Sequence, residues 1–510
     1  MKQKKSSPPK KTSYFRWFWL LIILCMILRL GLSLYLMADN NYFFTLSADD
    51  VARYRIAILW SEDASFFPDP TWPPFPFWLG GLMIKIFASG HATLSILSII
   101  ASILSIPLLG LLCWGLIPQT GPSWRFSTML PLFVPLAIFV FYPRWIWLGS
   151  SMLAESLYTF LFLLSFIAFI LAIDRRSILF AFSALVIAIL ASMTRLEGIA
   201  LVGIIYLLMV WRLRRHTKTL QWVCFIIIGG ALTLSFPLTW VIAHNGTQGT
   251  ISYLSTLKHG FSSQYSHSAL WTPIHFLRIY IGVSPLYLFI IIVGISAAWH
   301  ERKKNPGIHD LIGYQIMLTA LYIMSQISAS TLGMMPTHNL WRLTFPIFVT
   351  LLPYIGVTFA MIGQFVPARL LVLPAALCIF YLIPSFTKPP VFVSSDLYQS
   401  GIDLKTEIKY HSYSKGKTLI EVNGWEWLTL EVIGQGTDLG ELLYDRDPHK
   451  RDNSALNPPV FKRPAAQLEK YLENQNVEIV AVKTFEAKQT MMQLGWKAVK
   501  SSRYAIFIKP

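Results

Sequence analysis

Charged residues are scarce in this sequence. Asp, Glu, Lys and Arg together make up 14% of its 510 residues, whereas a soluble protein carries roughly 25%. Hydrophobic residues make up 54%, the mean hydropathy is +0.51, and the apolar residues gather in long runs. The composition therefore excludes a water-soluble enzyme and indicates an integral membrane protein.

Cysteine is rare in the sequence, and no internal repeat is visible. The chain has four cysteines, all inside apolar runs, and no CxxC pattern. A disulfide-bonded outer loop and a cysteine-based zinc site are therefore excluded. No repeat with a period of roughly 20–50 residues is visible, which excludes a solenoid.

Positive charge exceeds negative charge by 17, but its distribution argues against nucleic acid as a partner. The basic residues sit in short clusters between apolar runs, as the positive-inside bias predicts. The lysine-rich N-terminus precedes the apolar run Trp17–Met37, which is too long for a signal peptide and lacks an A-x-A cleavage site. We expect this run to be the first membrane helix, with the N-terminus in the cytoplasm.

The apolar runs predict an all-α polytopic membrane bundle of about eleven transmembrane helices. The predicted spans are Trp17–Met37, Leu94–Leu116, Phe126–Tyr142, Leu153–Ile173, Ile178–Met193, Gly198–Trp211, Val223–Ala243, Ile279–Trp299, Leu311–Ile327, Leu343–Ile362 and Leu370–Ile383.

A twelfth apolar run, Phe75–Ala88, decides the topology. It is too short to span, follows Pro73-Pro74 and contains Lys85. If it does not cross, the basic loops near Arg175, Arg214 and Lys303 all lie on the same side as the N-terminus, as the positive-inside bias requires. We therefore predict a surface helix at 75–88 within a long outer loop, 38–93.

The composition changes after Ser385. Residues 1–386 are predicted to form the transmembrane domain, and the polar residues 387–510 a small α/β domain outside the membrane. Its strands are predicted at Thr418–Val422, Glu478–Val482 and Tyr504–Ile508, and its helices at Pro464–Gln475 and Phe485–Leu494.

The first outer loop begins with two adjacent carboxylates, Asp49 and Asp50, followed by Arg53 and Tyr54. A solvated turn or a helix N-cap would explain the aspartates in isolation. Their place in a long loop that is folded back by a proline-led helix favours a site at the membrane surface instead.

Further charged candidates lie at the predicted outer ends of membrane helices. Glu155 opens one span, where a carboxylate either caps the helix dipole or serves a function. Arg195 and Glu197 share one turn and are able to pair with each other. Arg342 at the boundary is either a phosphate ligand or an interface anchor. Lys258 and His338 lie in the remaining outer loops, and the histidines have no zinc-site spacing.

These features resemble the GT-C glycosyltransferases, which use polyprenyl-phosphate-linked sugars, and among them the branch of the protein O-mannosyltransferases and the aminoarabinose transferase. The resemblance rests on Asp49-Asp50, Trp72-Pro73-Pro74-Phe75, Glu155 and the Arg195–Gly198 turn, and covers residues 1–385. Two departures stand out. Trp72 occupies a position that is often His, and the acidic pair is Asp-Asp where Asp-Glu is common.

The resemblance implies displacement at the anomeric carbon of a lipid-phosphate sugar, with inversion. Asp49 or Asp50 would be the general base, and Glu155 would orient the acceptor, a water or a metal. Arg195, Arg342 and Lys258 would hold the phosphate. Arg53, Tyr54, Glu197 and His338 are further site candidates. No cofactor is certain, and a divalent cation, Mg²⁺ or Mn²⁺, is left open.

The expected partners are the lipid bilayer, a polyprenyl-phosphate sugar donor and an unassigned acceptor, which is a protein, a lipid or a polysaccharide. The expected location is a bacterial inner membrane. A transporter or flippase of lipid-linked glycans is the main alternative, and a glycan polymerase or ligase is another. A continuous polar path through the bundle would favour transport, since transporters carry polar groups at mid-membrane.

Overall fold

The structure is a computed structural model. It describes residues 11–39, 48–64, 73–87, 92–116, 126–214, 217–243, 285–302, 306–331, 341–380, 404, 406, 408, 410, 417–421, 442–445, 459–501 and 504–509. The described chain divides into two compact units. The first comprises Met1–Phe44, Pro70–Leu79 and Leu94–Pro389, and the second comprises Thr45–Asp69, Gly80–Thr93 and Pro390–Pro510.

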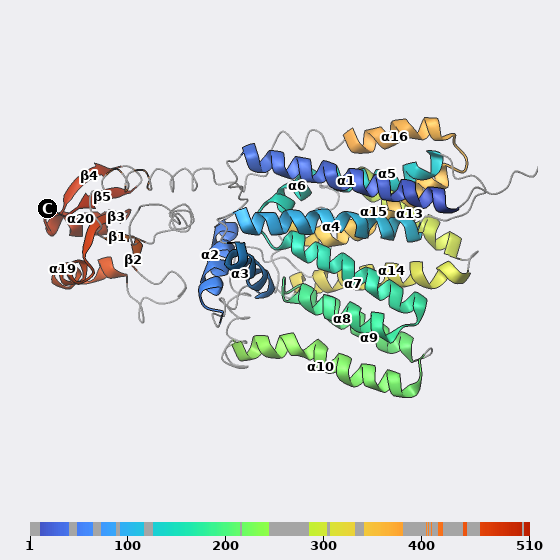
Figure 1. The fold of residues 1–510 in the computed structure, drawn as a ribbon, viewed down its shortest axis with the longest axis horizontal. Coiled ribbons are helices and arrows are strands. Elements are labelled where there is room, and N and C mark those ends of the chain that lie inside the picture. The colour runs from blue at the N-terminus through green and yellow to red at the C-terminus, as the bar shows by residue number, and fades with distance from the viewer. Residues whose placement is uncertain are drawn as a thin grey trace, which may run out of the picture. The chain divides into compact units, whose positions relative to one another are not determined.

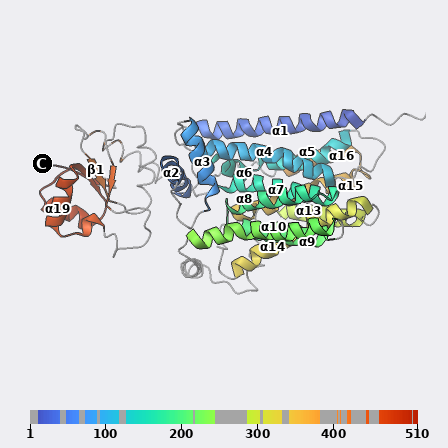
Figure 2. The same ribbon diagram turned by 60° about the horizontal axis from the view of Figure 1, so that its bottom comes forward.

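The first unit is a bundle of helices (Figures 1 and 2). Its elements are α1 (Lys11–Asp39), α4 (Ala92–Leu116), α5 (Phe126–Phe141), α6 (Pro143–Ser150), α7 (Glu155–Arg175), α8 (Ile178–Ser192), α9 (Gly198–Leu213), α10 (Thr219–Ala243), α13 (Pro285–Arg302), α14 (Pro306–Thr331), α15 (Trp341–Ile362) and α16 (Ala368–Phe380). Each of the eleven predicted spans corresponds to one of these helices, and α6 was not expected.

The number of membrane crossings stays a prediction. Among the described residues, five helices are long and apolar enough to span a membrane, and the pair α5–α6, bent by 56° at Tyr142-Pro143, would make a sixth. Helices α8 and α9 are among the shorter apolar ones. Large apolar side chains cover the exposed faces of α1 and α10, where only 28% and 17% of the spanning windows are buried. Such faces suit contact with lipid.

Proline and glycine set local geometry in this bundle. Pro143 cannot continue the hydrogen bonding of α5, so the chain bends there and α6 begins. The segment Pro143–Met152, expected to be an outer loop, is therefore mostly helix, and its α6 portion is largely buried. At Gly294 of α13, a β-carbon would lie 1.9 Å from the carbonyl oxygen of Tyr354 in α15. Only glycine permits so close a helix contact.

The first loop is also more helical than expected. Helix α2 (Ala48–Glu62) begins at the acidic pair, and α3 (Phe75–Phe87) matches the predicted helix at 75–88 to within a residue. The position of α3 on the membrane surface stays a prediction.

The C-terminal residues form a five-stranded sheet with the order β2-β1-β3-β5-β4. The strands are β1 (Lys417–Ile420), β2 (Leu442–Tyr444), β3 (Val477–Val482), β4 (Lys497–Ser501) and β5 (Ala505–Ile508). β1 is parallel to β2 and β3, whereas β5 is antiparallel to β3 and β4. Helices α19 (Ala465–Asn474) and α20 (Phe485–Gln493) share a core with Leu419, Val480 and Phe507. The α/β prediction and all five predicted elements are confirmed, and β2 and β4 are additional.

Candidate functional site

The turn between α8 and α9 carries two of the predicted site residues. Its backbone is fixed by hydrogen bonds from the Arg195 amide to the Ala191 carbonyl and from the Gly198 amide to the Arg195 carbonyl. A β-carbon at position 198 would lie 2.5 Å from the backbone nitrogen of Ser192. The glycine of the Arg195–Gly198 motif is therefore needed because the first turn of α9 passes directly over the end of α8.

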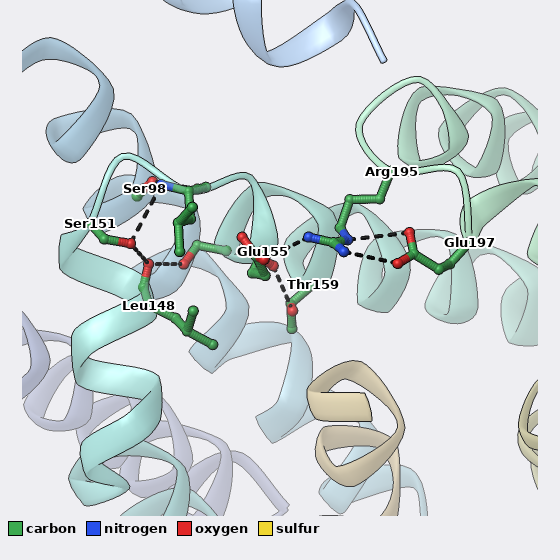
Figure 3. Close-up of polar contacts among 9 residues, drawn as sticks. Ser98, Leu148, Ser151, Glu155, Thr159, Arg195 and Glu197 are labelled. Atoms are coloured by element: carbon green, nitrogen blue, oxygen red, sulfur yellow. Dashed lines mark hydrogen bonds and ion pairs between the residues drawn. The ribbon is translucent and has the colours of Figure 1, made fainter. Parts of the chain in front are cut away.

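Arg195 binds two carboxylates at once (Figure 3). Its Nη1 donates to Glu155 Oε1 at 2.6 Å, and its Nη2 and Nε donate to Glu197 Oε1 and Oε2 at 2.8 and 3.3 Å. The predicted pairing of Arg195 with Glu197 is thus present as a bidentate contact. Glu155, 40 residues earlier in the chain, completes what we call the carboxylate–arginine cluster.

Charge balance in this cluster is negative, because two carboxylates face one guanidinium. Arg195 and Glu197 each expose 11% of their side chains, and Glu155 exposes 2%. Burial lowers the pKa of Arg195, but the carboxylates of Glu197 and Glu155 outweigh it, so the pKa is raised above its usual value. The two carboxylates therefore favour the charged form of the guanidinium.

Serine side chains hold the segment that leads into Glu155. Ser98 Oγ of α4 donates to the Leu153 carbonyl at 3.1 Å, and Ser156 Oγ of α7 donates to the Leu148 carbonyl of α6 at 3.0 Å. Thr159 Oγ1 donates to the Glu155 carbonyl at 2.8 Å (Figure 3). These bonds fix the start of α7, and with it the direction of the Glu155 side chain.

Arg29 of α1 fixes the bend between α5 and α6. The side chain is fully buried and donates to Ser102 Oγ at 3.0 Å, to the Val140 carbonyl at 3.3 Å and to the Trp145 carbonyl. Its guanidinium also lies 5.6 Å from the centre of the Trp145 ring. The bend at Pro143 leaves the Val140 carbonyl, at the end of α5, without a helical partner, and a cation satisfies it well.

The proline motif ends at the same turn. The Phe75 amide, at the start of α3, donates to the Met193 carbonyl at 3.0 Å. Met193 is the C-cap residue of α8 and lies two residues before Arg195. Three motifs that are far apart in the sequence therefore meet here: Pro73-Pro74-Phe75, Glu155 and the Arg195–Gly198 turn.

The acidic pair lies in the first turn of α2, in the second compact unit. Asp50, Arg53 and Tyr54 are buried, with exposures of 0%, 7% and 2%, and their spacing places them on one face of the helix. Burial raises the pKa of the Tyr54 phenol to about 12. The side chain of Asp49 lies outside the described residues.

Three further predicted residues, besides Asp49, have no described side chain. Lys258 and His338 lie outside the described residues, and Arg342 is described only as part of the first turn of α15. Among the residues that the structure does describe, no group of three or more His, Cys, Asp or Glu side chains is placed to hold a metal ion. The pair Glu155 and Glu197 could contribute at most two carboxylate ligands to a cation that a phosphate also binds.

No protein-family model and no curated protein sequence matches the chain. Among solved structures, ArnT from Cupriavidus metallidurans in the apo state matches with a TM-score of 0.53, covering 97% of this chain and 98% of ArnT at 11% identity. ArnT is an aminoarabinose transferase of the GT-C superfamily. The chain shares the fold of ArnT.

Two weaker likenesses accompany this one. ArnT from the same organism, bound to undecaprenyl phosphate, matches with a TM-score of 0.49 and 12% identity, covering 98% of both chains. The archaeal oligosaccharyltransferase AglB from Archaeoglobus fulgidus, in complex with an inhibitory peptide and a dolichol phosphate, matches with a TM-score of 0.48 and 12% identity, covering 91% of this chain and 69% of AglB. The fold assignment rests on the apo structure of ArnT.

Sequence reasoning missed several residues that support the carboxylate–arginine cluster. Tyr158 of α7 and Tyr322 of α14 share a hydrogen bond of 2.5 Å between their hydroxyls, one helical turn from Glu155. Arg29 lies in the first predicted span, but its contacts with Ser102, Val140 and Trp145 join residues far apart in the sequence. Ser98 and Ser156 gave no signal, because single serines in apolar helices are common.

Proposed function

We propose that this protein is a membrane glycosyltransferase that moves a sugar from a polyprenyl-phosphate donor to an acceptor hydroxyl. The observation that carries the proposal is the carboxylate–arginine cluster of Glu155, Arg195 and Glu197, beside the proline-led start of α3. Charged side chains at one end of an apolar bundle suit a substrate whose polar head lies at the membrane surface and whose tail lies in lipid. The GT-C fold is consistent with this chemistry.

The reaction is a single displacement. A carboxylate takes the proton of the acceptor hydroxyl while its oxygen forms a bond to the anomeric carbon. The bond from that carbon to the phosphate oxygen breaks, and the polyprenyl phosphate leaves with the electron pair. One displacement inverts the configuration at the anomeric carbon.

We assign the role of base to Asp49 or Asp50 and an orienting role to Glu155. Asp50 has the burial that a base protected from bulk water needs. Arg53 and Tyr54 lie on the same face of α2 as Asp50.

The leaving phosphate needs more positive charge than Arg195 supplies. Arg195 donates three of its five N–H groups to carboxylates, so two remain for a phosphate. The net negative charge of the cluster would repel that phosphate unless further cations are present. Arg342 and Lys258 supply them in this proposal, with His338 nearby in the chain. A bound Mg²⁺ or Mn²⁺ would serve the same purpose.

We place the reaction on the extracytoplasmic face of a bacterial inner membrane. The positive-inside distribution of the basic loops supports this sidedness. The C-terminal domain would then be extracytoplasmic as well, and we assign it to recognition of the acceptor, which is a protein, a lipid or a polysaccharide.

Purified protein in liposomes, offered a panel of radiolabelled polyprenyl-phosphate sugars, tests the proposal. We expect release or transfer of one sugar, and loss of most of that activity in Asp50→Asn and Glu155→Gln. Asp49→Asn distinguishes the two candidate bases. Glu473→Gln, an exposed carboxylate of α19, is the matched control and should keep full activity. Full activity in both aspartate variants would overturn the assigned base.

One observation favours transport of lipid-linked glycans as a second candidate. Helix α14 carries four buried polar side chains on one face, Gln315, Thr319, Tyr322 and Gln326. The same liposomes distinguish the candidates. A flippase would move a fluorescent lipid-linked sugar between leaflets without breaking the bond to phosphate, whereas a transferase would cleave that bond. A polymerase or ligase would instead transfer whole glycans.

A further inference from the structure

Helix α14 has a buried polar face inside an otherwise apolar bundle. Gln315, Thr319, Tyr322 and Gln326 follow one another at spacings of four, three and four residues, and expose 0%, 5%, 0% and 3% of their surfaces. This spacing places them on one stripe of the helix, roughly 16 Å long. Buried polar groups in a membrane protein are costly unless they are hydrogen-bonded.

The middle of this stripe is satisfied by α7. The Tyr322 hydroxyl shares its hydrogen bond with Tyr158, which follows Glu155 by one helical turn. The ring of Phe162 lies 5.0 Å from that of Tyr322, measured between centroids. The tyrosine pair therefore joins α7 to α14 just below the carboxylate–arginine cluster.

The part of the stripe on the N-terminal side of Tyr322 is different. Within the described part of the chain, no group accepts from or donates to the Gln315 amide, and none bonds the Thr319 hydroxyl. Leaving these buried groups without a hydrogen-bond partner would lower the stability of the fold. The side chains of α7 offer little here, because fully buried Phe166 and Phe169 occupy the corresponding turns. The ring centroid of Phe169 lies 6.2 Å from that of Tyr314, the residue that precedes Gln315.

We propose that Gln315 and Thr319 bind ordered water at the interface of α7 and α14. A water molecule is the ligand that fits, because it donates and accepts at once and is small enough for a packed interior. Gln315 offers both a donor and an acceptor, and Thr319, one helical turn away, offers a hydroxyl. Tyr322, a further turn along the same face, closes the site on the side of Glu155.

Apolar rings border the proposed water site on the side of α7. The phenylalanine rings of α7 flank the stripe, and they offer no hydrogen bond to a polar substrate. The bound water would instead extend the Tyr158–Tyr322 pair into a hydrogen-bonded network behind Glu155. The inference does not depend on glycosyl transfer.

Radiolytic footprinting of the full chain in lipid nanodiscs tests the proposal. Hydroxyl radicals formed from bound water label the side chains beside it, even when these are closed to bulk solvent. We expect labelling of Tyr322, with exposed Tyr410 as the positive reference and buried Phe507 of β5, in the core of the C-terminal sheet, as the negative one. The double variant Gln315→Met/Thr319→Val should lose most of the Tyr322 label. An unlabelled Tyr322 beside a labelled Tyr410 would overturn the site.

Thermal unfolding gives a second, independent readout. Thr319→Val is nearly isosteric, so it lowers the melting temperature if the hydroxyl bonds to water. In a dry interface the same change removes an unsatisfied group and raises the melting temperature. An unchanged or higher value would therefore contradict the proposal. Thr350→Val in α15 is the matched control, because that hydroxyl bonds the Ile347 carbonyl of its own helix at 2.7 Å.

Discussion

Arg195 Nη1 lies 2.6 Å from Glu155 Oε1, although the two residues are 40 positions apart and belong to different helical hairpins. The same guanidinium holds Glu197 through two further contacts. The arginine thus fixes the position of two carboxylates at one end of the bundle. Without it, like charges would face each other in a site with little water to screen them.

The first prediction concerns the energy of this cluster. Arg195→Gln should lower the free energy of unfolding by ~2–4 kcal/mol, because it leaves two carboxylates without their cation. Glu155→Gln should cost about half as much or less, since Arg195 keeps its contacts with Glu197. The double variant should lose less free energy of unfolding than the two single variants together, and the difference, which is the coupling energy, should be about 1–3 kcal/mol. Thermal or denaturant unfolding in nanodiscs measures all three.

Additive losses would mean that the two side chains do not interact in the membrane. Glu473→Gln serves as the control for loss of one exposed carboxylate. It should change stability by no more than about 0.5 kcal/mol.

The second prediction separates two glycines of helix α9. Gly198→Ala should destabilise the protein, because the new β-carbon meets backbone atoms of Ser192 and Ala191 at 2.5–2.8 Å and these cannot move aside easily. Gly203→Ala, in the same helix, meets nothing within 4 Å and should be neutral or stabilising by up to about 1 kcal/mol. Melting temperatures of the two variants give the comparison. Equal effects would show that the turn does not require glycine.

The helices of this protein could be predicted from the sequence, because a long apolar run is local information. All eleven predicted runs became helices. Helix α2 was expected to be a loop, since its mixed polar sequence has no long apolar run and its burial comes from tertiary contacts. Helix α6 was missed because Pro143 was taken to end the preceding helix. Proline is also a favourable first residue of a helix, and it begins α6 here.

The candidate site was predictable in parts only. The pairing of Arg195 with Glu197 follows from their spacing in one turn. The contact between Arg195 and Glu155 does not, because it depends on how α7 packs against α8. Pairings across a bundle have no signature in a single sequence, and the same applies to the Tyr158–Tyr322 hydrogen bond.

The third prediction concerns Arg29. Arg29→Met should lower the free energy of unfolding by ~2–4 kcal/mol, because the carbonyls of Val140 and Trp145 lose a charged donor. Arg29→Lys should restore little, since one ammonium cannot reach the three acceptors that a planar guanidinium bridges. Arg16→Met, at an exposed position of the same helix, is the control. Full rescue by lysine would show that charge alone matters at position 29.

The fourth prediction concerns pH. The pKa of Tyr54 is raised to about 12 by burial, from an ordinary value near 10. Above pH 10 the unfolded chain releases the phenolic proton while the folded chain keeps it, so stability falls between about pH 10 and 12. Below pH 10 the phenol is protonated in both the folded and the unfolded chain, so Tyr54 causes no loss of stability there.

Tyr54→Phe should weaken this alkaline loss of stability and remove one late transition from the phenolate absorbance titration. Tyr410→Phe, which removes an exposed tyrosine, is the control for the loss of one phenol. Identical alkaline unfolding of the wild type and Tyr54→Phe would show that Tyr54 ionises freely in the folded protein.

The last prediction concerns the C-terminal domain, where one carboxylate holds a helix in place. Glu421, just after β1, is 6% exposed. It accepts hydrogen bonds from the Lys483 amide at 2.5 Å, the Thr484 amide at 2.8 Å and the Thr484 hydroxyl. Thr484 is the N-cap of α20, so Glu421 fixes the start of that helix beside the central strand.

Glu421→Gln should destabilise this domain by about 1–3 kcal/mol, because an amide accepts fewer of these bonds and sets its own N–H groups against donors. Hydrogen exchange on the full chain should then show faster exchange at the amides of Lys483, Thr484 and Ala487. Glu478→Gln, a half-buried residue of β3, is the matched control and should leave those amides protected. Unchanged exchange in Glu421→Gln would mean that α20 is held by its apolar contacts with the sheet, chiefly Ala487 and Met491, and not by the carboxylate.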